Sequence, residues 1–134
     1  MKVRIDNEAD AIYIYIQEIE LKVADTIIAD TIIADEFCHL DGMINFDIDS
    51  KWYVIGIEML PIDFLGNLDN IHYYFESHDK LKVIISDNNI TKKYSIYNDK
   101  IIIFIDSNDK IASIEIIDIF DKNNFSEKLV VENI

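Results

Sequence analysis

The sequence has few of the residues that cofactor sites and disulfide scaffolds require. Its 134 residues include one cysteine, one proline and three glycines. The single Cys38 excludes a disulfide within the chain and fits a reducing compartment. With so few glycines there is no phosphate loop, nucleophile elbow or Rossmann fingerprint, so we predict no cofactor. Scarce glycine and proline also argue against a disordered chain.

Basic residues and long apolar runs are also scarce. Lys and Arg number 12 against 26 Asp and Glu, which gives a formal net charge of −14 at pH 7. Such a field repels nucleic acid and anionic membranes and speeds encounter with basic partners. The apolar runs are too short to span a bilayer, and no secretory signal is recognisable. We predict a cytoplasmic protein that binds neither nucleic acid nor membranes.

The abundant residues favour β-structure. Half of the chain is hydrophobic, and its β-branched and aromatic residues suit a pleated, half-buried surface. Met43–Leu60, MINFDIDSKWYVIGIEML, has the pattern of a β-hairpin. A shift of 57 positions places Lys100–Ile117, KIIIFIDSNDKIASIEII, on top of it, with an Ile-Asp-Ser and an Ile-Glu motif in common. The sequence therefore predicts a hairpin that is built twice.

Further segments predict strands around these hairpins. Met1–Asp6 and Ala11–Gln17 form a first hairpin, and Ile71–Glu76 loosely resembles the Tyr-Ile strand within it. Ile101–Ile105 is apolar without alternation, which is typical of a central strand covered on both faces. Other strands are predicted at Leu81–Ser86, Ile90–Tyr97 and Lys110–Ile119.

Two segments leave alternatives open. Glu20–Asp35 contains ADTIIADTIIAD, whose period of five fits neither a strand nor a helix, so two short strands, one bent strand or a short helix remain. In the tail, Asn124–Glu127 would cap a short helix that carries Leu129–Val131, and the same Leu129–Val131 would equally form an edge strand.

These patterns predict one all-β, or β-dominated, domain over residues 1–134. It contains two related antiparallel units, at residues 1–62 and 68–119, and a tail at residues 120–134. The units are expected to form a continuous sheet, a sandwich or a partly open barrel, with an optional short C-terminal helix.

The N-terminal stretch MKVRIDNEADAIYIYI combines a basic strand, the acidic turn Asp6–Ala11 and a Tyr-Ile strand. With Val23–Thr26 and the hairpin around Gly56, it resembles the DUF2283 family of small bacterial and phage proteins over residues 1 to 60. The resemblance implies a small β-rich fold and no established activity. Genes of this family often lie beside small toxin-like genes, which implies an antitoxin-type role. An insertion around Thr26–Phe37 and the whole second half depart from the family pattern.

Several polar groups are candidates for chemistry, and each has a simpler interpretation. Glu58 and Glu115 occupy equivalent strand positions. They are interpreted either as a carboxylate pair of the kind that glycosidases use or as solvated residues on an outer face. Asp6–Asp10, or Asp47 with Asp49, offers oxygen ligands for Ca²⁺ without an EF-hand pattern, and turn chemistry explains them more simply. Neither the histidines nor Cys38 has zinc-ligand spacing. We predict neither a catalytic nor a metal site.

The acidic surface and its exposed aromatic residues favour protein binding. We predict a non-enzymatic, acidic module of antitoxin or immunity type that occludes the active site of a basic toxin or nuclease. The alternatives are a structural protein of bacterial or phage origin that oligomerises through its edge strands, and a β-barrel that binds a small molecule or metal. A cross-strand packing role is the other interpretation of Trp52. The predicted contact residues are Asp30, Asp35, Glu36, Asp47, Asp49 and Trp52.

Overall fold

A computed structural model describes residues 1–16, 30–33, 42–119 and 129–133 of the chain. These residues form strands and two short 3₁₀ turns, η2 (Ile62–Phe64) and η3 (Leu68–Asn70), so the predicted all-β class is confirmed. The described strands make two separate sheets, which excludes the alternative of one continuous sheet. No helix in the described ranges is long and apolar enough to cross a membrane.

The chain divides into two compact units. The first unit contains Met1–Ile62 together with Ile119–Ile134, and the second contains Asp63–Asp118. The C-terminal residues therefore belong to the first unit, although the sequence suggested a separate tail.

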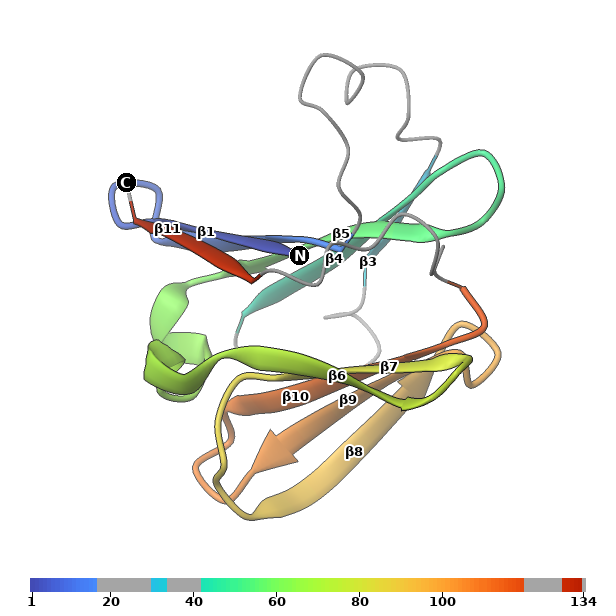
Figure 1. Cartoon of the computed structure of the whole chain (residues 1–134). Coiled ribbons are helices and arrows are strands. Elements are labelled where there is room, and N and C mark those ends of the chain that lie inside the picture. Colours follow the sequence, from blue (N-terminus) through green and yellow to red (C-terminus); the bar gives the residue numbers. More distant parts are fainter. Residues whose placement is uncertain (17–29, 34–41, 120–128, 134) are drawn as a thin grey trace. The chain divides into compact units, whose positions relative to one another are not determined.

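The first unit is built on a six-stranded sheet in the order β11-β1-β2-β5-β4-β3 (Figure 1). The strands within residues 1–62 all pair antiparallel, as predicted for this unit, and β11 from the tail adds to β1 in parallel. The strands are β1 (Lys2–Asp6), β2 (Ala11–Tyr15), β3 (Asp30–Ile33), β4 (Met43–Ile48), β5 (Val54–Leu60) and β11 (Val130–Asn133).

The segments that the sequence left open are described only in part. Val130 and Val131 lie in β11, so the strand alternative is correct there and the helix is wrong. A 2.9 Å ion pair between Lys2 and Glu132 links β11 to β1, and the hydrogen bond from Lys2 lowers the pKa of Glu132. Of the pentapeptide repeat, Asp30–Ile33 form β3, and residues 17–29, 34–41 and 120–128 lie outside the described part.

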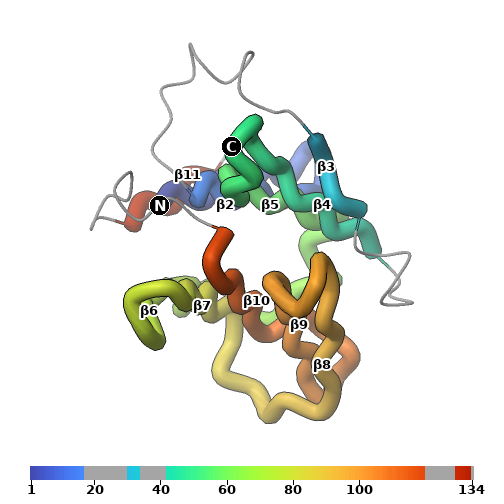
Figure 2. Tube along the Cα trace, turned by 90° about the vertical axis from the view of Figure 1, so that its right-hand side faces the viewer, coloured from blue at the N-terminus to red at the C-terminus, as the bar shows by residue number. Residues whose placement is uncertain are grey.

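The second unit is built on a five-stranded antiparallel sheet in the order β6-β7-β10-β9-β8 (Figure 2). Gly66 and Leu65, between the two 3₁₀ turns, attach to Ile111 at the start of β10 through a backbone hydrogen bond and an isolated bridge. The strands are β6 (His72–Ser77), β7 (Lys80–Ile84), β8 (Ile90–Ile96), β9 (Ile101–Asp106) and β10 (Ile111–Ile117).

The two sheets share one topology. If β11 is set aside, the order β1-β2-β5-β4-β3 has the same connectivity as β6-β7-β10-β9-β8. The duplication therefore covers five strands, whereas the sequence indicated it clearly only for the closing hairpin. The strand equivalent to β2 is β7, because each pairs with the return strand of its hairpin. The suggested similarity of Ile71–Glu76 to β2 is therefore wrong, since β6 is the counterpart of β1.

The closing hairpins match residue by residue. Ile44 pairs with Met59 and Phe46 with Ile57, and the residues 57 positions later pair in the same way. Both return strands have an irregularity at the equivalent position, Ile55 in β5 and Ala112 in β10. The predicted hairpin repeat is thus confirmed, and the structure adds a β-bulge at the same place in both copies.

An aspartate closes each hairpin turn. One carboxylate oxygen of Asp49 accepts hydrogen bonds from the backbone N–H groups two and four residues later, at 2.9 Å each. Asp106 does the same at 2.8 and 3.0 Å, and its other oxygen accepts from the Asn88 side chain at 3.0 Å. The fourth residue of each turn has a positive φ, 70° at Trp52 and 58° at Asp109. The Ile-Asp-Ser motif is therefore a turn signal in both copies.

Isoleucine side chains dominate the buried face of each sheet, as period-two alternation predicts. The strand covered on both faces is β10, and β9 instead alternates, with Ile102 and Phe104 half-buried. The strand Ile101–Ile105 has a neighbour on each side, as predicted, but the prediction that both of its faces are covered is wrong. Glu115 on β10 is only 6% exposed, so the expectation of a solvated residue there is wrong as well.

Candidate interaction surface

The side chains opposite the isoleucine core of the first sheet form a polar face. Strand register places them in two adjacent rows that cross the sheet. One row contains Arg4, Tyr13, Glu58, Asn45 and Ile33, and the next contains Lys2, Tyr15, Gly56, Asp47 and Thr31.

A hydrogen-bonded chain of side chains spans four strands of this polar face. The Tyr13 hydroxyl on β2 donates to Asp47 on β4 at 2.5 Å, and the Thr31 hydroxyl on β3 donates to the other oxygen of Asp47 at 2.9 Å. To reach Asp47, the Tyr13 ring lies across Gly56 on β5, where a Cβ atom would stand 2.1 Å from the hydroxyl oxygen. Burial, followed by the hydrogen bond to Asp47, raises the pKa of Tyr13 above its usual range.

The second unit makes the same diagonal contact with different chemistry. Strand pairing makes Lys82 the counterpart of Tyr13 and Phe104 the counterpart of Asp47. The Lys82 ammonium lies 4.7 Å from the centroid of the Phe104 ring, which is a cation–π contact. Ser113 stands where the first unit has Gly56. The geometry is retained between the units, while the polar groups that it presents have changed.

A hollow of about 270 Å³ opens on the polar face of the first unit. This volume is below that of a typical cofactor pocket and suits a single side chain or a small polar group. Tyr13 and Tyr15 form one wall, with ring centroids 4.4 Å apart. The lining residues are Arg4, Asp6, Ala9, Ala11, Ile12, Tyr13, Tyr15 and Glu58.

Glu58 lies at the centre of the polar face, beside the hollow. It is half-buried and accepts a 3.3 Å hydrogen bond from the Asn45 side chain. Within the described ranges, no lysine or arginine nitrogen lies within 4 Å of its carboxylate. Glu58 therefore offers an acceptor toward the hollow that no described cation neutralises.

The structure does not gather the predicted contact residues into one patch. Asp30 is exposed, but it shares a face with Ile32 and so lies on the opposite side of the sheet from Asp47. Asp47 is engaged by Tyr13 and Thr31, and Asp49 by its own turn. Trp52, at 61% exposure, projects from that turn. Two further predicted contact residues, Asp35 and Glu36, lie outside the described part.

The acidic groups proposed for metal binding have structural partners. Asp6 accepts a hydrogen bond from the backbone of Ala9, and Asp10 accepts one from that of Ile62. No group of three or more metal-ligating side chains is placed to hold an ion among the described residues.

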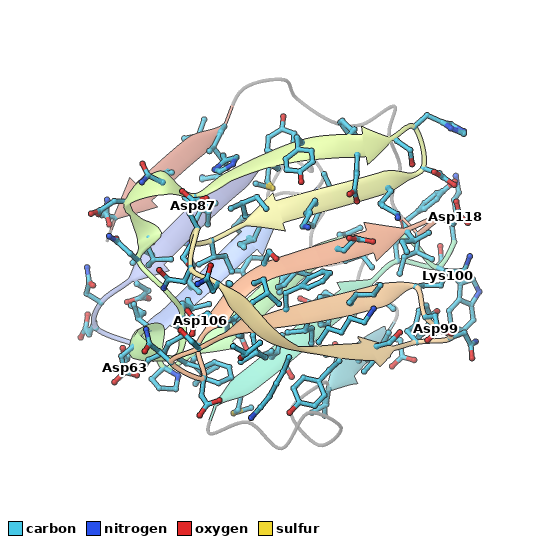
Figure 3. The ribbon with its side chains drawn as sticks, turned by 90° about the horizontal axis from the view of Figure 1, so that it is seen from below. Asp63, Asp87, Asp99, Lys100, Asp106 and Asp118 are labelled. Carbon is cyan, nitrogen blue, oxygen red and sulfur yellow. The ribbon has the colours of Figure 1, made fainter. Side chains whose placement is uncertain are left out.

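Aspartates also gather at both ends of the second sheet. Figure 3 shows Asp99, Lys100 and Asp118 at one end and Asp63, Asp87 and Asp106 toward the other. Lys100 and Asp118 form a 3.0 Å ion pair, and the Lys110 ammonium donates to the Asp63 backbone carbonyl. A hydrogen bond from Ser77 lowers the pKa of Asp79, which lies in the β6–β7 turn. These groups are therefore partly paired within the second unit.

The negative charge is unevenly divided between the units. The first unit contains 16 acidic and six basic residues, a formal charge of −10, whereas the second contains ten and six, a formal charge of −4. The polar face thus belongs to the more acidic unit.

Sequence reasoning placed Glu58 on an outer face but missed the hollow and the Tyr13–Asp47 contact. The available signal was Gly56, one of three glycines, in the interior of a predicted strand. A glycine at such a position often marks a close approach by another group.

Comparison with known proteins gave no match. No protein-family model matches the chain, and neither a search of curated proteins nor a search of solved structures found a similar protein.

Proposed function

We propose that the protein is a non-enzymatic binding module that inhibits a basic protein, in the manner of an antitoxin or immunity protein. Negative charge on the first unit attracts the cationic partner, and the polar face of that unit covers the partner's nucleic-acid site. The observation that carries the proposal is the charge of −10 on the unit that also presents the hollow with Glu58. The same role is what the sequence resemblance of residues 1 to 60 to the DUF2283 family implies, although no family model matches the chain.

The charge of the first unit allows the salt dependence of the association rate to be estimated. Complementary charge raises association rate constants from about 10⁵–10⁶ M⁻¹s⁻¹ to as much as 10⁸–10⁹ M⁻¹s⁻¹ at low salt. Screening shortens the range of the field from roughly 14 Å at 0.05 M salt to roughly 4 Å at 0.5 M. Association with the partner is therefore expected to slow at least about tenfold over this interval.

The test uses the protein encoded by the gene adjacent to the gene of this chain. We expect a basic protein whose nuclease activity is lost on addition of the chain, with the salt dependence given above measured by stopped flow. Replacing Glu8 and Asp30 with their amides should slow association more than replacing Asp69 and Asp87, a matched loss of two exposed charges in the second unit. Salt-independent association, or no complex, would refute the proposal.

Assembly through sheet edges is the second candidate function. The edge strands β3 and β11 of the first sheet carry exposed Ile33, Val130 and Val131, at 45, 42 and 43%. Exposed apolar edge strands are templates for pairing with another chain. Sedimentation should then show an oligomer that persists at high salt and dissociates on replacement of Ile33 by lysine.

A further inference from the structure

The second unit places a lysine where the first unit has the hollow. Lys80 on β7 pairs with Ile117, and its ammonium lies 3.4 Å from the buried Glu115 carboxylate and 3.9 Å from Glu76. The Glu115 side chain is only 7% exposed, and a buried carboxylate is costly unless a cation accompanies it, as Lys80 does here. Lys80 is thus an internal cation held between two carboxylates on the polar side of the sheet.

Strand register identifies the equivalent position in the first unit as Ala11. Ala11 opposes Asp6 on β1 as Lys80 opposes Ser77 on β6, directly after Glu76. Glu58 is the counterpart of Glu115, 57 positions earlier. The hollow in the first unit is therefore lined by the counterparts of the groups that surround Lys80, with a methyl group in place of the lysine side chain.

We propose that this hollow binds the ammonium group of a lysine side chain from the basic partner, in the place that Lys80 takes in the second unit. The inference rests on the proposed function, and it identifies the chemistry that the polar face recognises. The incoming ammonium pairs with Glu58 and Asp6, and its methylene stem lies along the Tyr13 and Tyr15 rings. The partner's lysine thus pairs with Glu58 in the way that Lys80 pairs with Glu115 in the second unit.

Arg4 is the cation that lines the hollow, and it is exposed. Among the described residues no carboxylate lies within 4 Å of its guanidinium group, so Glu58 remains available to another cation. Arg4 also pairs with Glu132 of β11 in the strand register. The positive charge of Arg4 contributes to the lowered pKa of Glu132.

The first experiment uses small probes and needs no partner. N-acetyl-lysine methylamide is titrated into the full chain and followed by NMR at the Ala11 amide and the Glu58 carboxyl carbon. We expect saturable shifts at both positions, and none with N-acetyl-norleucine methylamide, which lacks only the ammonium group. N-acetyl-arginine methylamide is expected to bind more weakly than the lysine probe. Equal shifts with the norleucine and lysine probes, or none with lysine, would overturn the inference.

Two reciprocal variants exchange alanine and lysine at the equivalent positions of the two units. Ala11→Lys is expected to place an internal ammonium beside Glu58, to lower the carboxyl pKa of that residue in a ¹³C titration, and to abolish the probe shifts. Lys80→Ala opens the equivalent space beside Glu115 and should create a second probe site there. Ser107→Lys, an exposed turn position in the second unit, adds the same charge as a control and should leave probe binding unchanged. If Lys80→Ala does not fold, the Ala11→Lys comparison decides alone.

The partner complex separates this inference from the proposed function. Ala11→Lys should weaken the complex at least tenfold, and Ser107→Lys by much less. A partner that binds both variants equally would refute the hollow as its contact and leave inhibition intact. Failure of any basic partner to bind the wild-type chain would refute the proposed function, and the lysine probe would still decide whether the hollow binds an ammonium group.

Discussion

Replacing Gly56 with alanine is expected to push the Tyr13 ring off β5 and break its hydrogen bond to Asp47. The three atoms nearest to a Cβ built on Gly56 all belong to Tyr13, at 2.1, 2.6 and 2.9 Å. These distances are far inside van der Waals contact, so the ring must move. Ser113 occupies the equivalent position of the second unit, where the slimmer Lys82 crosses the strand. The backbone therefore accepts a side chain here, and the ring alone creates the conflict.

The cost follows from three terms. Loss of a hydrogen bond to a charged acceptor costs about 1.5–3 kcal/mol, and a displaced rotamer costs about 0.5–1.5 kcal/mol. Alanine restricts the unfolded chain and returns about 0.5–1 kcal/mol. Because the hydrogen bond is only partly buried, we expect a net loss of about 2 kcal/mol in the free energy of unfolding. At roughly 3–5 °C per kcal/mol for a chain of this length, Tm should fall by roughly 6–10 °C.

A double-mutant cycle tests the cause of this loss. Gly56→Ala is measured by urea unfolding, followed by circular dichroism, in the wild-type chain and in a Tyr13→Ala background. Without the ring, the alanine has no clash and should be neutral or slightly stabilising. An equal cost of Gly56→Ala in both backgrounds would show that the strain lies in the backbone, and would refute the role given to Tyr13.

Three further outcomes follow from the contacts of the two sheets. The pKa of Tyr13 is raised in the native state, so above a pH of about 10 the unfolded chain loses this proton while the native state keeps it. The free energy of unfolding should therefore fall as the pH rises. The same titration of Tyr13→Phe measures how much of the fall is due to Tyr13. Asp106→Ala should cost roughly 3–5 kcal/mol in urea unfolding, because it removes three hydrogen bonds made by a carboxylate that is 0% exposed, whereas Asp49→Ala at the half-buried counterpart should cost about 1–3 kcal/mol, and equal costs would contradict this account. Lys82→Met should cost at most about 1 kcal/mol by the same method, since the cation–π contact with Phe104 is half-exposed, and a larger loss would show that Lys82 has a further role.

Local patterns in the sequence were sufficient for much of the fold. The hairpins ending at Leu60 and Ile117, their inward isoleucines and the aspartates of their turns were all predictable, because alternation and turn chemistry act within a few residues. The predictions failed where the outcome depended on a distant partner. Glu115 is buried on the central strand β10 with Lys80 of the neighbouring strand as its ion-pair partner, and one face of β9 is only half-covered.

The candidate site depends almost entirely on such distant partners. Tyr13 and Asp47 are 34 residues apart and meet only because β5 lies between their strands with a glycine at the crossing point. The hollow likewise requires Asp6 and Glu58 to approach from strands on either side of β2. The sequence by itself determined the strand class, the acidic charge and the repeated hairpin, since these are properties of composition and of neighbouring residues. Only the tertiary structure decided the strand order, the full five-strand duplication and the hollow at the position equivalent to Lys80, because each depends on which strands pair across long stretches of chain.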